Sequence, residues 1–199
     1  MSFSKAFDDT VPRRRLLLKL ENYGGSILEW IRSFLSHRQQ QVDVGGEVSA
    51  WMDVLSGVPQ GSVLGPVLFV CYINDMPELI SSVIYMYADD TKLLSKVCRE
   101  VDTVRLQSDL SIFCEWSKEW QLSFNVGKCK VMHIGSNNSH AKYTMISVDG
   151  NEQYLKETAE ERDLGVWMDL YVEVFHTCRA LSLQSKPDTG FNIQIFYLH

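Results

Sequence analysis

The strongest candidates for a chemical role in this sequence are two adjacent carboxylates, Asp89 and Asp90. They stand between two apolar runs, residues 83–86 and 93–94, and this pattern predicts a β-hairpin with both acids at its tip. Carboxylate oxygens are preferred ligands of Mg²⁺, and two such ions can hold the attacking and leaving oxygens of a phosphoryl transfer. A solvated turn is the alternative, because Asp also favours turns through local hydrogen bonds.

A loop rich in glycine and proline lies upstream, at residues 57–61, and Ser62 follows it. Glycine has no Cβ, so the backbone can approach a ligand closely, while Pro59 fixes one φ angle and helps the loop hold its shape. Ser62 is suited to cap a helix that starts there. The loop is therefore a candidate binding element, with an ordinary connector as the alternative.

These segments carry a resemblance to a known family. The residues Phe-Ser-Lys-Ala-Phe-Asp (3–8), Gly-Val-Pro-Gln-Gly-Ser (57–62) and Tyr-Ala-Asp-Asp (87–90) resemble motifs A, B and C of the reverse transcriptase palm, in the version found in non-LTR (LINE, jockey-type) retrotransposons. Residues 125–128 resemble motif D and residues 163–166 the start of motif E. Three motifs in the family's order are a much more specific signal than one. The resemblance extends over residues 2–169.

The resemblance implies a role for each matched residue. Asp89 would be the principal catalytic ligand of Mg²⁺ or Mn²⁺, with Asp90 as its supporting neighbour. The implied nucleotide-binding residues are Phe7, which would screen the sugar, Pro59, Gln60 and Gly61 in the loop, and Lys128, which would meet the triphosphate. The implied partners are an RNA template, a DNA primer and a deoxynucleoside triphosphate.

The sequence departs from the family's pattern at one catalytic position. In the family, the first catalytic aspartate precedes the aromatic residue of motif A by five residues, and here that position is Ser2. A hydroxyl replaces neither the charge nor the ligand strength of a carboxylate at a Mg²⁺ site. Asp8 and Asp9 are close by, but neither has the right place on the strand. Residues that act as a unit fail together, so this loss should lower the rate by orders of magnitude.

Two functional interpretations remain open. The first is an RNA-directed DNA polymerase domain fragment, whose family carries out two-metal nucleotidyl transfer but which is itself expected to be inactive. The second is a non-catalytic remnant of a mobile element that either binds nucleic acid or protein weakly or has no selected role. Other phosphoryl-transfer enzymes lack support, because the sequence contains neither a G-x-x-x-x-G-K-[ST] loop nor a kinase signature.

The charge balance bears on these interpretations. The formal net charge of -6 is unfavourable for binding to nucleic acid. Such binding depends on Lys and Arg side chains that displace counterions from the phosphates. Arg13, Arg14 and Arg15 form the one concentrated basic feature, which would lie either on phosphates or on a solvated helix face. We therefore expect weak binding, or a basic surface supplied elsewhere.

Five scattered cysteines without a C-x-x-C pair indicate neither a disulfide framework nor a zinc site. We find no signal peptide pattern, and the longest apolar run, residues 67–73, is too short to span a bilayer. The sequence thus predicts an intracellular protein of the nucleus or cytoplasm, without membrane contact.

The elements that must position these residues suggest an α+β fold. We expect a palm with an antiparallel sheet backed by helices near residues 12–22, 62–75 and 101–118, and with fingers and thumb largely missing. Alternating residues predict strands at 122–125 and 130–134, and Gly45-Gly46 predicts a tight hairpin. We divide the chain into a partial reverse transcriptase domain, residues 1–169, and a divergent, poorly ordered tail, residues 170–199.

Overall fold

The computed structural model describes residues 11–59, 61–135, 138–147, 149–169 and 192–198. Its centre is a five-stranded sheet in the order β10-β7-β13-β6-β5. The strands are β5 (Val83–Tyr87), β6 (Asp90–Lys96), β7 (Lys130–Ile134), β10 (Lys156–Glu157) and β13 (Ile193–Leu198). Four of them pair antiparallel, as expected, but β10 runs parallel to β7, so the sheet is mixed. The fold therefore combines helices and strands around one sheet that contains both antiparallel and parallel pairs.

Alternation along the strands gives this sheet two different faces. One face carries Leu93, Val131 and Phe196, which belong to the main hydrophobic core. The other carries Leu94, Met132 and Ile195, which form a smaller cluster of their own. Successive side chains of a strand point to opposite faces, so Asp90 and Lys92 lie on the same face as Leu94. The acidic hairpin tip thus belongs to the face with the smaller cluster.

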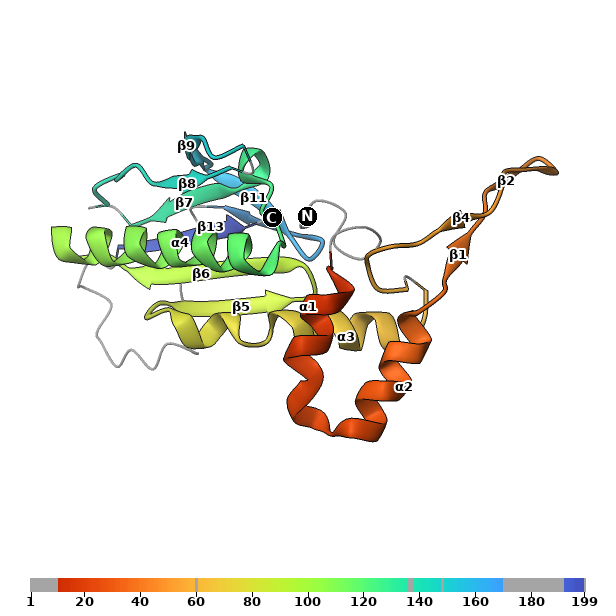
Figure 1. Cartoon of the computed structure of the whole chain (residues 1–199). Helices are drawn as coiled ribbons and strands as arrows, with labels where there is room; N and C mark the ends of the chain where they lie inside the picture. The colour runs from red at the N-terminus through yellow and green to blue at the C-terminus, as the bar shows by residue number, and fades with distance from the viewer. Residues whose placement is uncertain (1–10, 60, 136–137, 148, 170–191, 199) are drawn as a thin grey trace.

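Helices supply the other half of the main core. They are α1 (Arg13–Leu20), α2 (Gly25–Leu35), α3 (Leu64–Ile73) and α4 (Glu100–Trp120), with short 3-10 helices η1 (Glu21–Tyr23), η2 (Met76–Leu79) and η3 (Val126–Lys128). The long helix α4 lies across the sheet (Figure 1) and buries Leu106, Leu110 and Phe113 completely. The three predicted helices of the palm are confirmed, each with ends within about two or three residues of those expected. Among the described residues, no helix is both long and apolar enough to cross a membrane.

Four small two-stranded ladders surround this core. The arm that projects away from the sheet in Figure 1 consists of β1 (Gln39–Gln40) with β4 (Met52–Asp53) and β2 (Asp43–Val44) with β3 (Glu47–Val48). Gly45 and Gly46 join β2 to β3 with φ angles of 63° and 90°, which confirms the predicted hairpin. The other two ladders pair β8 (Thr144–Ile146) with β9 (Glu152–Tyr154) and β11 (Glu160–Asp163) with β12 (Val166–Asp169).

Two expectations about the strands were wrong. Residues 122–125 form no strand: Leu122 and Phe124 are buried in the core, but the Leu122 N–H donates to the Ser117 carbonyl (3.1 Å), which ends the helix α4 instead of joining a ladder. The expectation of a loosely ordered tail is wrong for residues 193–198. These residues form β13, which is buried along its whole length between β6 and β7.

Candidate active site

The hairpin that carries the two acids is formed as predicted. Tyr87 pairs with Asp90 across β5 and β6, so Ala88 and Asp89 are the two loop residues of a tight turn. Ala88 has a φ of 52°, in the left-handed region that the first loop residue of such turns requires. Asp89 and Asp90 are both half-buried. The turn therefore presents two neighbouring carboxylates from one short and well-defined segment.

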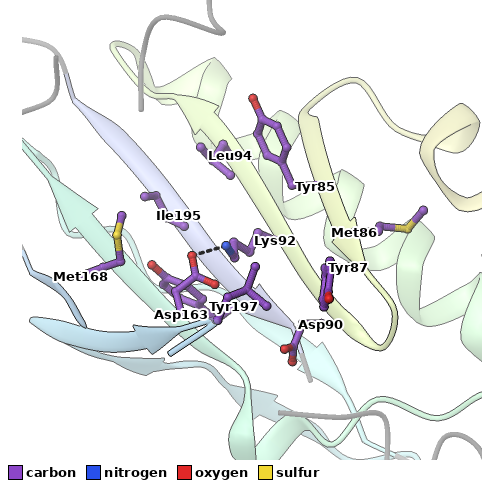
Figure 2. A pocket seen from close by; sticks show the side chains of 11 residues that line it. Tyr85, Met86, Tyr87, Asp90, Lys92, Leu94, Asp163, Met168, Ile195 and Tyr197 are labelled. Atoms are coloured by element: carbon purple, nitrogen blue, oxygen red, sulfur yellow. Dashed lines mark hydrogen bonds and ion pairs between the residues drawn. The ribbon is translucent and has the colours of Figure 1, made fainter. Parts of the chain in front are cut away.

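A pocket opens on the sheet face that carries Asp90 (Figure 2). Its volume is about 390 Å³, within the range of small-molecule sites, which is roughly 300–1,000 Å³. Asp90, Lys92 and Leu94 line it from β6, Tyr85 and Tyr87 from β5, and Ile195 and Tyr197 from β13; the hairpin β11–β12 closes it with Asp163, Leu164 and Met168. The lining is mainly apolar and aromatic, with its charged groups at the end nearest the acidic turn.

Two ion pairs fasten β11 over this face. Lys92 of β6 pairs with Asp163 (Figure 2), and Lys130 Nζ of β7 lies 2.6 Å from Glu161 Oε2. Asp163 and Glu161 are two residues apart on β11, so both side chains leave the same side of that strand. Between the two lysines, Tyr197 of β13 pairs with both of them in the register of the sheet. Salt bridges thus attach β11, which forms one wall of the pocket, to the sheet.

Tyr197 is buried beside the two acids of these ion pairs, Asp163 and Glu161. Burial raises the pKa of Tyr197, and the negative charges of Asp163 and Glu161 raise the same pKa further. The phenol therefore stays neutral, and it offers hydrogen bonds instead of charge.

Hydrogen bonds to Val11 and to the Ser62 side chain hold the loop at residues 57–61. The Gly57 N–H donates to the Val11 carbonyl (2.9 Å), and Pro59 is buried. The Ser62 hydroxyl donates to the Pro59 carbonyl (2.7 Å) and accepts the Gly65 N–H (2.9 Å) at the start of α3, as expected of a capping serine. Gly61 is exposed with a φ of 79°, a conformation that favours glycine.

Gly65 shows how tightly this loop lies on the helix. A Cβ atom at Gly65 would lie 2.3 Å from the Pro59 carbonyl oxygen, so no other residue fits there without movement of the backbone. In Figure 1 the amino end of α3 and the β5–β6 turn lie toward the same side of the molecule. The structure thus places Pro59 directly against the start of α3.

Lys128 is exposed at the end of η3, and Cys129 separates it from β7. Lys130 lies level with Lys92 through their shared partner Tyr197, and β6 and β7 run in the same direction. Strand β6 begins at Asp90, and Lys128 comes shortly before the start of β7, so both residues lie toward the end of the sheet where these two strands begin. Between β6 and β7 lies β13, which sets their backbones about 10 Å apart.

Three of the predicted positions, Ser2, Phe7 and Gln60, lie outside the described residues. Among the described ones, the structure brings Asp89 and Asp90 together on one turn and Pro59 and Gly61 together in one loop. Sequence reasoning missed Lys92 and Tyr197. Lys92 follows Asp90 by two residues on one strand, a signal that alternation could have given. Tyr197 gave no such signal, because its pairing depends on residues far away in the sequence.

Comparisons with known proteins identify the family. The family described as reverse transcriptase (RNA-dependent DNA polymerase) matches residues 1–168, nearly all of the segment that carries the motifs. This chain belongs to the reverse transcriptase family.

The similar proteins within this family are polymerases of mobile elements. The chain is 34% identical over 152 residues to the RNA-directed DNA polymerase from mobile element jockey of Drosophila funebris, covering 72% of this chain and 16% of that protein. It is 37% identical over 108 residues to the jockey polymerase of Drosophila melanogaster, covering 50% and 12%. The probable polymerase from transposon X-element of the same species is 33% identical over 104 residues, covering 49% and 12%. The chain thus resembles non-LTR retrotransposon polymerases over a small part of their length.

The donor set at the turn fits a divalent cation of the kind this family uses. Two adjacent, half-buried carboxylates on a fixed turn supply hard oxygen ligands, which suit Mg²⁺ or Mn²⁺. Both carboxylates, however, come from the same hairpin.

Proposed function

We propose that this chain is a palm fragment of a non-LTR retrotransposon reverse transcriptase that holds a divalent cation at Asp89 and Asp90 but does not polymerise DNA. The observation that carries the proposal is that both strands next to β6 lack a carboxylate. Strand β6 pairs with β5 on one side and with β13 on the other, and neither of these strands contains Asp or Glu.

The missing carboxylate matters because of how such a site works. Two cations lie about 3.5–4 Å apart in two-metal sites, and bridging carboxylates from more than one strand hold them there. In this sequence, Ser2 stands at the position where the family has the catalytic aspartate of motif A, which would come from a strand other than the hairpin. A strand that carried a replacement carboxylate could pair with β6 only by displacing β13, which pairs with β6 from Thr91 to Lys96.

The remaining residues keep roles that fit binding. Asp89 would be the main metal ligand and Asp90 would support it; a bound cation would there neutralise phosphate oxygens and polarise a hydroxyl. Pro59, Gln60 and Gly61 would lie beside a nucleotide, Phe7 would screen its sugar, and Lys128 would meet its triphosphate. These assignments follow the family's motifs and extend to a template RNA and a DNA primer as partners.

The use of the basic residues supports weak binding of nucleic acid. Lys92 and Lys130, which underlie the pocket face, are both paired with acids of β11. Arg13 donates to the Ser56 carbonyl (3.5 Å) and Arg15 to the Glu119 carbonyl, so two of the three clustered arginines make contacts within the chain. Each cation that is engaged in this way displaces fewer counterions from phosphates.

Primer extension on an RNA template tests the proposal. The natural chain, the Ser2→Asp variant and the Asp89→Asn variant are assayed side by side with Mg²⁺ and with Mn²⁺, and Mn²⁺ binding is followed in parallel by the paramagnetic relaxation of solvent water. We expect no extension by the natural chain, and Mn²⁺ binding that weakens at least tenfold in Asp89→Asn.

Each outcome bears on a different part of the proposal. Extension by the natural chain that disappears in Asp89→Asn would overturn it, because another group would then replace the missing aspartate. Equal Mn²⁺ binding by the natural chain and Asp89→Asn would overturn the metal site. Extension only by Ser2→Asp would support the missing ligand as the cause of inactivity, and silence of all three chains would support a defect that extends beyond that ligand.

A further inference from the structure

A second group of potential metal ligands lies on the opposite face of the sheet from Asp90. His133 of β7, His140 of the following loop and Glu157 of β10 each offer one ligand atom, and these atoms all lie within 4.8 Å of one another. Glu157 pairs in register with Val131, a residue of the main core, and His133 lies two residues beyond Val131 on the same side of β7. The three side chains therefore converge on the face that α4 covers, away from the acidic turn.

The most buried member of this group has an unused ligand atom. His133 is only 4% exposed, and its Nδ1 atom is buried without a hydrogen-bond partner. A buried polar atom without a partner is costly, so such an atom usually has a ligand, an ion or a water as its partner. The ring of His140 lies 4.9 Å from the ring of His133, centroid to centroid, on the solvent side. The buried imidazole of His133 thus has a second imidazole beside it.

The loop that carries His140 is anchored to the sheet at two strands. Asn138 Nδ2 donates to the carbonyls of Ile134 and Ile193, both at 3.3 Å, and Asn138 Oδ1 accepts the His140 N–H at 3.3 Å. His140 itself has a φ of 48°, an uncommon conformation for a residue other than glycine. On its other side, His140 Nδ1 lies 2.6 Å from Glu157 Oε1. The three groups are thus already gathered before any ligand binds.

We propose that His133, His140 and Glu157 form a zinc site, with water in the fourth position. Two imidazole nitrogens and one carboxylate oxygen are a common three-ligand set for Zn²⁺, whereas Mg²⁺ prefers oxygen ligands throughout. In a tetrahedral zinc site the ligand atoms lie about 3.3 Å apart, given bond lengths near 2.0–2.1 Å. The exposed side chains of His140 and Glu157 can make the small adjustment that closes the present spacing around the buried His133.

The site would act as a cross-link within the fold. It joins β7, the loop after it and β10, which is the short edge strand of the sheet and pairs with β7 at only two positions. Bound Zn²⁺ would thus stabilise an edge that has few hydrogen bonds of its own. The site shares no residue with the Asp89–Asp90 turn, so a test of this site is independent of the cation site proposed at that turn.

Zinc and cobalt titrations of the full-length chain test this site. At Zn²⁺ concentrations about 100-fold above the dissociation constant, we expect the melting temperature to rise by about 5–10 °C. Co²⁺ should give the visible absorption bands of a tetrahedral site, with one ion per chain. A large excess of Mg²⁺ should leave the Co²⁺ bands unchanged, because Mg²⁺ prefers oxygen ligands and should not displace Co²⁺ from this site.

Two matched variants locate the ion. His140→Asn removes one proposed ligand, and His37→Asn removes an exposed histidine elsewhere that has nearly the same backbone conformation, with a φ of 50°. Asn tolerates the left-handed region, so both variants should keep the backbone. We expect His140→Asn and Glu157→Gln each to weaken Zn²⁺ binding at least tenfold, and His37→Asn to leave it unchanged.

The proposal would be overturned if the natural chain bound no Zn²⁺. It would equally be overturned if His140→Asn bound Zn²⁺ as the natural chain does, or if His37→Asn and His140→Asn lost binding to the same extent.

Discussion

At the scale of single residues, Asp102 shows how one carboxylate holds a helix in place. It lies in the first turn of α4, where one oxygen accepts the N–H groups of Cys98 (3.1 Å) and Arg99 (3.0 Å), and Arg105 lies 3.4 Å from the other oxygen. The N–H of Cys98 contributes most to lowering the pKa of Asp102, burial opposes it, and Arg99 and Arg105 lower it further. The ionised carboxylate is therefore the form that stabilises the folded chain.

This arrangement predicts a pH-dependent contribution to stability. The pKa of Asp102 in the folded chain is below its value in the unfolded chain, about 3.9, so the contribution is complete above that pH and is lost as the pH falls through the lower pKa. We expect Asp102→Asn to reduce the free energy of unfolding by about 1–2 kcal/mol at pH 7. The difference from the natural chain should shrink below about pH 4.

Urea unfolding at a series of pH values measures both effects. Glu100→Gln is the control, because Glu100 lies in the same helical turn but is exposed. A difference between Asp102→Asn and the natural chain that stayed constant down to pH 2.5 would contradict the prediction.

At the scale of elements, the hairpin β11–β12 is held on the sheet by side chains of a single strand. Glu161 is 4% exposed and pairs with Lys130, while its neighbour in sequence, Glu160, is exposed. Replacing Glu161 by Gln leaves the partly buried ammonium of Lys130 without a counter-charge. We expect Glu161→Gln to lower the free energy of unfolding by on the order of 1–3 kcal/mol and to loosen the hairpin over the pocket.

Hydrogen exchange resolves this effect by element. Exchange of the amides of residues 160–169 should speed up in Glu161→Gln before that of β6 and β7 does, since the hairpin is attached mainly through its two ion pairs. Glu160→Gln should leave exchange close to that of the natural chain. Uniform acceleration across the sheet in Glu161→Gln would mean that the hairpin has no independent opening.

The elements that the sequence predicted well are those set by neighbours in the chain. The turns at Gly45-Gly46 and Ala88-Asp89 follow from turn chemistry, and the helix α4 follows from its apolar spacing. Residues 122–125 have the alternation of a strand but find no partner, because pairing depends on what lies beside them in space. The acidic turn was therefore predictable, whereas the pocket wall from β11 and β13 was not.

At the scale of the whole molecule, β13 decides how the sheet is completed. Its six residues are at most 4% exposed, and Phe196 and Leu198 belong to the main core while Ile193, Ile195 and Tyr197 belong to the opposite cluster. Gln194 is also buried, where it accepts the Tyr143 hydroxyl and donates to Asn138 Oδ1 (3.3 Å). One strand thus contributes to both faces and to a buried polar network.

Removing residues 193–199 should therefore cost far more than a surface truncation. The chain shortened after Asn192 loses the ladders to β6 and β7 together with the apolar side chains of both faces. Burial of each large apolar residue is worth about 1.5–3 kcal/mol, so the loss exceeds the total stability of a typical domain, about 5–15 kcal/mol, when the ladders are included. We expect the shortened chain to lose cooperative thermal unfolding and near-ultraviolet circular dichroism.

The same truncation connects the fold to the function proposed for the chain. If the shortened chain kept a cooperative transition, the edge of β6 beside Asp90 would be free, and a strand with a second carboxylate could pair there. Loss of cooperative folding would instead mean that this edge is filled as a condition of folding. Neither strand that pairs with β6 would then supply a second carboxylate for the acidic turn.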